Sequence, residues 1–217
     1  MRYFIEFAYN GKNYHGWQQQ PNAPSVQETL GKAIAVLLRS DVEITGAGRT
    51  DTGVHAKQMF AHFDTEISFE ATILKNRLNS YLPKDIAILK IHTVADDAHA
   101  RFDAVKRTYE YHVTTVKDVF EEPLSWYCHQ ALDMEKMNQA AKILFEFSDF
   151  QCFSKVNTDV KTFQCKIMEA YWKQDGHKLV FTIAADRFLR NMVRAIVGTL
   201  VAVGMGKISL EDFRKII

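Results

Sequence analysis

The 217-residue chain carries 27 Lys and Arg residues against 26 Asp and Glu residues, a formal net charge of +1. Hydrophobic residues make up 47% of it and charged residues 24%, which is ordinary for a globular protein. No apolar run approaches the roughly 18 residues of a membrane helix. The first residues alternate like a strand and lack the layout of a signal peptide. The chain is long enough to bury a core as one domain or two small ones.

The three cysteines, Cys128, Cys152 and Cys165, are an odd number at wide spacing. This spacing argues against a disulfide framework and fits no zinc pattern. The eight His residues are scattered and form no ligand cluster with the cysteines. We therefore expect no metal and a reducing, cytoplasmic location.

The first half of the chain reads as alternating strands and helices. Ser25, with Glu28 three residues later, has the pattern of a capping box at the start of a helix. In chain order we expect a strand at Arg2–Tyr9, a loop at 10–24, a helix at 25–39, a glycine-rich loop, a strand at 58–64, a helix at 70–81 and a strand at Ile86–Val94.

The second half repeats this mixture. Asp133 is placed to cap a helix, and Ser209 with Asp212 resembles a second capping box. We expect strands at 106–115, 166–173 and 179–185, and helices at 133–145, 188–203 and 209–217. No low-complexity segment or Gly/Ser linker separates the halves, so 95–104 is expected to pass between packed units. The pattern predicts an α+β protein.

One loop carries most of the chemical information. Gly46, Gly48 and Gly53 surround Arg49 and Asp51. Glycines let a loop turn tightly and approach a ligand closely. A carboxylate beside a guanidinium stays ionised, so Asp51 could serve as a nucleophile or a base. The alternative is a structural turn whose Asp binds backbone amides, and spacing alone favours that reading.

The wider pattern resembles the TruA family of tRNA pseudouridine synthases. The resemblance spans nearly the whole chain, in the family's order, and its most specific part is the nine-residue run GRTDTGVHA at 48–56. The other matching segments are YNG at 9–11, YHGWQQQ at 14–20, SVQ at 25–27, HARFDA at 99–104, RTYEY at 107–111, FSDF at 147–150 and FLRNMVR at 188–194.

The resemblance implies a fold of two pseudo-symmetric α/β subdomains whose antiparallel sheets meet at a central catalytic cleft. Here these would be residues 1–104, with the catalytic loop, and 105–217. It also implies isomerisation of uridine to pseudouridine at positions 38, 39 and 40 of the tRNA anticodon stem-loop, by a homodimer that needs no cofactor. The family normally continues into a TAPxxGLxL-like segment, which is absent here, so we expect the second subdomain to lack its final strand.

The site residues follow from the same resemblance. Asp51 matches the family's catalytic aspartate, and Arg194 matches the arginine that pairs with it. Tyr109 matches the tyrosine that stacks on the base, which the resemblance also makes a candidate for removal of the C5 proton. Arg49 matches the arginine that helps displace the target nucleotide. Without the resemblance, Tyr109 would read as a core aromatic.

Two further sets of residues are candidates for contacts with RNA. Arg187, Arg190 and Arg194 are spaced three and four apart, so they would share one face of a helix. That face could equally be a solvated polar surface. Trp17 and Gln18 belong either to a loop that faces RNA or to a polar loop anchored by a buried Trp.

Two other functions compete with the synthase. An aspartate-dependent glycoside hydrolase would need two carboxylates beside a sugar, and the glycine-rich loop offers one. A non-catalytic RNA-binding module is disfavoured by the presence together of Asp51, Tyr109 and Arg194.

Overall fold

The computed structural model describes residues 1–121, 124–155 and 160–217. The chain divides into two compact units, Met1–Ala104 and Val105–Ile217. Each unit has its own four-stranded sheet and its own hydrophobic core. The expected α+β class is confirmed.

In the first unit the sheet order is β2-β3-β1-β4, and every neighbouring pair is antiparallel. Its elements are β1 (Arg2–Tyr9), the short 3-10 helix η1 (Gly11–Asn13), α1 (Val26–Leu38), β2 (Ile44–Gly46), β3 (Ala56–Asp64), α2 (Ala71–Tyr81) and β4 (Ile86–Val94). The sequence predicts β1 and β4 to the residue. Strand β2 is missed, because it falls where only a glycine-rich loop is expected.

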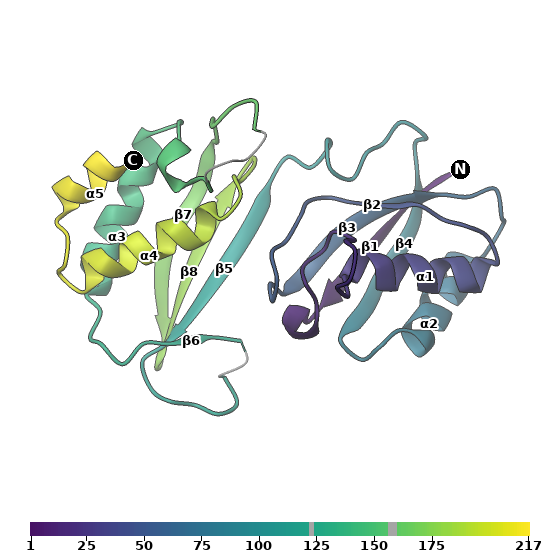
Figure 1. Cartoon of the computed structure of the whole chain (residues 1–217), viewed down its shortest axis with the longest axis horizontal. Helices are drawn as coiled ribbons and strands as arrows, with labels where there is room; N and C mark the ends of the chain where they lie inside the picture. The colour runs from purple at the N-terminus through teal and green to yellow at the C-terminus, as the bar shows by residue number, and fades with distance from the viewer. Residues whose placement is uncertain (122–123, 156–159) are drawn as a thin grey trace. The chain divides into compact units, whose positions relative to one another are not determined.

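The first unit buries one face of its sheet under two helices (Figure 1). Alternate residues of β1, Ile5 and Phe7 among them, are fully buried, as a period of two requires. Helix α1 begins as expected, since the Ser25 hydroxyl accepts from the Glu28 N–H at 3.2 Å. The Glu28 carboxylate instead contacts Lys32 Nζ at 2.5 Å, so the ion pair replaces the second half of the expected capping box.

In the second unit the sheet order is β6-β5-β8-β7. Its elements are β5 (Arg107–Thr114), β6 (Trp126–Tyr127), α3 (Met134–Ile143), the 3-10 helices η2 (Leu144–Glu146) and η3 (Gln151–Phe153), β7 (Ile167–Asp175), β8 (Lys178–Ala185), α4 (Met192–Gly204) and α5 (Leu210–Ile216). The sheet is antiparallel except for β5 and β6, which pair in parallel. This two-residue strand is too short to read from a sequence pattern.

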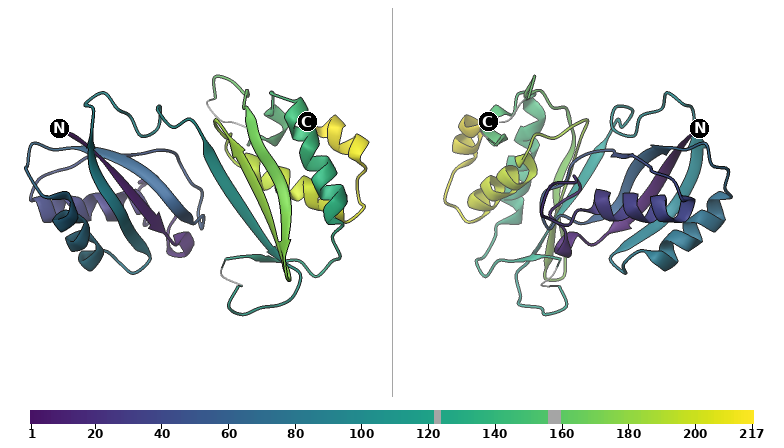
Figure 2. Two further views of the ribbon diagram at one scale, coloured as in Figure 1. Left: turned by 180° about the vertical axis from the view of Figure 1, so that it is seen from behind. Right: turned by 45° about the vertical axis from the view of Figure 1, so that its right-hand side comes forward.

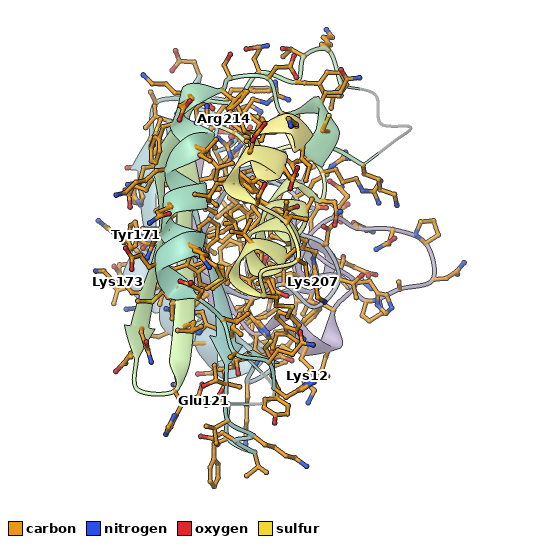
Figure 3. The ribbon with its side chains drawn as sticks, turned by 90° about the vertical axis from the view of Figure 1, so that its left-hand side faces the viewer. Lys12, Glu121, Tyr171, Lys173, Lys207 and Arg214 are labelled. Carbon is orange, nitrogen blue, oxygen red and sulfur yellow. The ribbon has the colours of Figure 1, made fainter. Side chains whose placement is uncertain are left out.

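Helices α3 and α4 lie on one face of the β5-β8-β7 strands (Figure 2). The other face of β7 is polar: Lys173 Nζ lies 5.3 Å from the centroid of the Tyr171 ring (Figure 3). The expected capping box of α5 is confirmed, because Ser209 and Asp212 exchange hydrogen bonds.

In both units, an asparagine on a neighbouring helix forms hydrogen bonds with the free backbone N–H and carbonyl groups of one residue in an edge strand. Asn79 of α2 accepts from the Ile88 N–H at 2.7 Å and donates to the Ile88 carbonyl at 2.9 Å. Asn138 of α3 does the same for Trp172 of β7, at 2.7 and 3.1 Å. An edge strand exposes unpaired backbone groups, and these amides cap one residue of each edge.

The start of α4 differs from the prediction. The apolar periodicity of 188–203 predicts a helix throughout, yet α4 begins at Met192. Asn191 adopts a left-handed conformation with φ 67°, which a continuous right-handed helix cannot contain. Residues 188–189 are therefore irregular, and 190–191 form a turn that leads into the helix.

Candidate functional site

The glycine-rich loop is held against the loop that follows β1. The Trp17 N–H donates to the Thr50 carbonyl at 3.3 Å, and the Gly53 N–H donates to the Tyr14 carbonyl at 3.3 Å. The hydroxyls of Tyr9 and Thr50 lie 2.9 Å apart. These backbone hydrogen bonds connect the residues on both sides of Asp51 to the other loop. They therefore fix the position of the Asp51 backbone.

Two glycines make the approach of the loops possible. A β-carbon at Gly11 would lie 2.0 Å from the Val54 carbonyl oxygen, and one at Gly16 would lie 2.2 Å from that of Thr50. Gly16 also has φ +88°, a conformation that side chains disfavour. The Gly11 N–H adds a bond to Nδ1 of His55 at 3.0 Å. The loop that begins at Tyr9 and the loop that begins at Gly46 are thus packed together, and we call the pair the loop clamp (residues 9–17 and 46–56).

The loop clamp leaves the Asp51 side chain exposed. Among the described hydrogen bonds and ion pairs of the first unit, none involves this carboxylate; the carbonyl of Asp51, not its side chain, accepts from the Val54 N–H at 3.2 Å. The alternative of a turn aspartate bound to backbone amides is therefore not what the structure contains. Arg49 is also exposed and makes no described ion pair with Asp51.

Trp17 is the buried anchor of the loop clamp. Its side chain is 2% exposed, packs 5.5 Å from the Phe7 ring, and would meet a β-carbon at Gly46 at 2.4 Å. No ring surface is left for an RNA base to stack on. The reading of Trp17 as an RNA contact is corrected to that of a buried anchor.

Gln27 braces the start of the exposed loop that follows Trp17. Its side-chain oxygen accepts from the Gln18 amide at 2.9 Å and from the Gln19 N–H at 2.8 Å, and its amide donates to the Ile44 carbonyl at 2.8 Å. Gln18 remains exposed in this fixed position.

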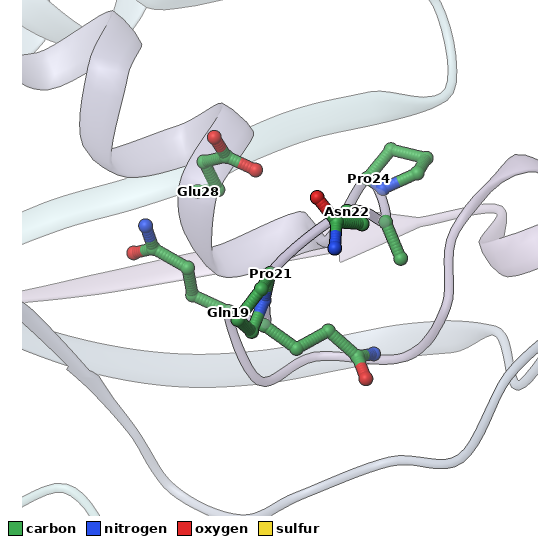
Figure 4. Close-up of a pocket in the computed structure, with 7 residues that line it drawn as sticks. Gln19, Pro21, Asn22, Pro24 and Glu28 are labelled. Atoms are coloured by element: carbon green, nitrogen blue, oxygen red, sulfur yellow. The ribbon is translucent and has the colours of Figure 1, made fainter.

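Beyond Gln18 the chain surrounds an open surface hollow of about 590 Å³ (Figure 4). The hollow is lined by Gln19, Gln20, Pro21, Asn22, Ala23, Pro24 and Glu28.

Asp85, in the turn just before β4, supports the part of the loop clamp that follows β1. Its carboxylate accepts from the Tyr14 hydroxyl at 2.7 Å and from the Asn13 amide at 3.3 Å, and its carbonyl accepts from the Asn10 N–H at 2.8 Å. Burial, followed by the bond to Asp85, raises the pKa of Tyr14. Sequence reasoning missed Asp85, Gln27 and His55 as parts of the site. Of these, only Gln27 and His55 lie in matched motifs.

In the second unit, Tyr109 lies half-buried on β5, with its ring edge-on to Phe188 at 5.2 Å. Phe188 belongs to the irregular segment before α4, so this contact brings Tyr109 together with the segment that leads into that helix. Arg194 stands exposed in the first turn of α4.

Arg187 and Arg190 precede α4 and do not share a helical face with Arg194, so that prediction is wrong. The Arg187 N–H donates to the Asp186 carboxylate at 2.8 Å, and the Arg190 carbonyl accepts from the Lys155 N–H at 3.0 Å. Arg190 is exposed and Arg187 half-buried.

Asp51, Arg49, Trp17 and Gln18 belong to the first unit, and Tyr109, Arg187, Arg190 and Arg194 to the second. Residues 1–121, 124–155 and 160–217 contain no group of three or more His, Cys, Asp or Glu placed to hold a metal ion. Over the same residues, no helix is long and apolar enough to cross a membrane.

Comparison with known proteins identifies the family to which the chain belongs. A family profile described as tRNA pseudouridine synthase matches residues 6–103 and 140–217. The chain belongs to the tRNA pseudouridine synthase family.

Individual relatives of the synthase agree. A protein of Bacteroides fragilis named tRNA pseudouridine synthase A is 58% identical over 218 residues, covering 100% of this chain and 86% of its own. A protein of the same name from Bacteroides thetaiotaomicron is 56% identical and is covered over 81% of its length. One from Methylacidiphilum infernorum is 36% identical over 99% of this chain and 85% of its own. The matched family resemblance is thereby confirmed, and the chain is an isomerase of this family.

Proposed function

We propose that this synthase converts uridine to pseudouridine at positions 38, 39 and 40 of the tRNA anticodon stem-loop, with Asp51 as its catalytic residue. The observation that carries the proposal is the exposed Asp51 carboxylate on a loop fixed by backbone contacts. A preorganised carboxylate without a partner in its own unit has no evident structural task. The motif match at 48–56 and the names of the relatives support the same reading.

The reaction is an isomerisation without net oxidation or reduction. The bond from ribose C1′ to uracil N1 breaks, the base turns, and C1′ bonds to C5. The C5 proton leaves and N1 gains a proton. A carboxylate beside an anomeric carbon assists such a cleavage in glycosidases, by attack or by charge stabilisation. Asp51 would act in one of three ways: on C1′, on uracil C6, or as the base that removes a ribose proton.

Arg194 and Tyr109 complete the proposed site. We assign Arg194 to pairing with Asp51, which would keep the carboxylate ionised and oriented. We assign Tyr109 to stacking on the uracil ring and to removal of the C5 proton. The contact between the Tyr109 and Phe188 rings supports this role, because it would keep the Tyr109 ring in one orientation beside the segment before α4.

The tRNA would be bound by arginine side chains and by the exposed amide of Gln18. Arg49, beside Asp51, is proposed to displace the target nucleotide, because extruding a base costs a few kcal/mol of unstacking. Arg187 and Arg190 would contact phosphates, although they do not share a helix with Arg194. The near-neutral total charge does not oppose this, because distribution along a surface decides phosphate binding.

The resemblance further supports a homodimer in a reducing, cytoplasmic location, where the three free thiols would persist. Light scattering of the purified chain would test the dimer. A mass of one chain, 24.9 kDa, at micromolar concentration would contradict it.

The activity is tested by incubating the purified chain with a tRNA transcript that carries uridine at positions 38, 39 and 40. Pseudouridine is mapped by chemical labelling that stops reverse transcription. We expect new stops at those positions and none in a transcript with cytidine in their place. Modification elsewhere, or none at any enzyme concentration, would overturn the proposal.

A further inference from the structure

A tight turn at the end of the first unit is unusually well fixed. The His99 N–H donates to the Asp103 carboxylate at 2.7 Å, and the Asp103 N–H donates to the His99 carbonyl at 3.0 Å. Nδ1 of His99 accepts from the N–H groups of Arg101 and Phe102 at 3.1 and 3.3 Å. Side chains at both ends of the turn therefore hold its backbone in one conformation.

The turn is also anchored to the sheet. Ala100 is 4% exposed, and its N–H donates to Nδ1 of His62, a buried residue of β3, at 3.2 Å. The His62 and His99 rings meet edge to face, with centroids 4.6 Å apart. Just before the turn, Nη1 of Arg2 donates to the Ala98 carbonyl at 2.9 Å.

At the tip of this support, Phe102 is 76% exposed. Its ring touches His99, with centroids 4.2 Å apart, and the guanidinium carbon of Arg101 lies 5.9 Å from its centroid. A flexible exposed Phe would be unremarkable, since single apolar residues are common at surfaces. Here, four hydrogen bonds from backbone N–H groups to side-chain acceptors fix a turn that offers an aromatic face to solvent beside a cation.

We propose that Phe102, with Arg101 beside it, is a stacking platform for an unpaired nucleobase of the tRNA substrate. The inference rests on the proposed function, which supplies an RNA with single-stranded loop bases. Proteins read such bases by stacking them on aromatic rings and on guanidinium planes. The platform lies outside the loop clamp and would position the RNA rather than take part in the reaction.

The test compares three substitutions in the full chain. Phe102→Leu keeps the apolar bulk and removes the π-face, Phe102→Ala removes both, and Phe102→Trp restores a ring. Phe120→Ala is the matched control, because Phe120 is 87% exposed and lies outside the turn. For each variant we would measure the Kd for a tRNA transcript and, without RNA, the melting temperature.

We expect Phe102→Leu and Phe102→Ala to weaken tRNA binding by roughly 5- to 160-fold, the range for loss of one stacked base. Phe102→Trp should bind as the unaltered chain does, and all melting temperatures should stay unchanged. The inference is overturned if Phe102→Leu binds as tightly as the unaltered chain. It is also overturned if affinity falls only together with melting temperature, or falls equally in Phe120→Ala.

Turnover of the unaltered chain, measured on the same transcript, separates the two proposals. If the unaltered chain forms pseudouridine while the Phe102 variants keep full affinity, only the platform is wrong. If it binds tRNA through Phe102 without forming pseudouridine, the platform stands and the enzymatic proposal fails. No tRNA binding at all would overturn both.

Discussion

Gly16 lies so close to Thr50 that a β-carbon at Gly16 would stand 2.2 Å from the Thr50 carbonyl oxygen. The contact joins the loop after β1 to the loop that carries Asp51, one residue beyond Thr50. Because the opposing atom belongs to the backbone, the clash could be relieved only by moving the two loops apart.

Gly16→Ala should therefore lower both stability and turnover. The left-handed φ of +88° alone costs about 1–3 kcal/mol for a residue with a side chain, and displacement of the loop adds to this. We expect turnover on tRNA to fall at least tenfold, measured beside the thermal midpoint.

Gly198→Ala is the matched control for that substitution. Gly198 lies within α4, and no atom stands within 4 Å of its would-be β-carbon. Alanine should be neutral or stabilise the helix by up to about 1 kcal/mol. If Gly16→Ala behaves like Gly198→Ala, the close approach of the two loops is not needed.

Gln27 should matter through position rather than chemistry. Gln27→Leu removes three hydrogen bonds and leaves the Gln19 N–H and the Ile44 carbonyl unpaired, which costs about 1–3 kcal/mol for each group that stays buried. We expect a lower melting temperature and weaker tRNA binding. Gln139→Leu, on the exposed face of α3, is the control and should change neither. Equal behaviour of the two variants would argue against a bracing role.

Asn138 should stabilise the second unit through its two bonds to Trp172. Asn138→Ala leaves one backbone N–H and one carbonyl of β7 unpaired at the sheet edge. We expect a loss of about 1–3 kcal/mol in the free energy of unfolding, measured by urea titration. Because Asn79 caps Ile88 in the same way, Asn79→Ala should cause a similar loss in the first unit. A loss below about 0.5 kcal/mol in both variants would mean that water satisfies these groups.

The thiols report on the fold independently of RNA. Cys152 is exposed, whereas Cys128 and Cys165 are buried. Burial raises the pKa of Cys165 to about 11, so at pH 8 its reactive thiolate is scarce as well as shielded. A disulfide reagent at pH 8 should label one thiol quickly and two more only on unfolding. Cys152→Ser should abolish the rapid phase; three rapid thiols in the native chain would contradict the packing described.

Local signals were sufficient for much of the fold. Strands β1 and β4 were predicted to the residue because alternation and flanking turn residues agree there. Helix α4 was extended too far because 188–191 continues the apolar period, and only the left-handed Asn191 ends it. Strands β2 and β6 have three and two residues and exist through pairing with distant partners, which no local pattern records.

Motifs in the sequence predict the candidate site residues, but they do not predict the residues that hold the site in place. Asp51 and Arg49 were located by the glycine-rich loop, but nothing in the sequence shows that Trp17 is buried beneath it. The bracing by Asp85 depends on contacts between segments far apart in the chain, and the bracing by Gln27 depends on how one loop folds back on the start of α1. Sequence periodicity also placed Arg187 and Arg190 on a helix that begins after them.

Asp51→Asn tests the central claim most directly, because it preserves the shape of a side chain that makes no described bond within its unit. The measurement is pseudouridine at positions 38, 39 and 40 of a tRNA transcript, alongside the Kd for that transcript. The account predicts loss of product by at least a thousandfold, with tRNA affinity within about threefold of the unaltered chain. Substantial turnover in Asp51→Asn would contradict the assignment of the catalytic carboxylate.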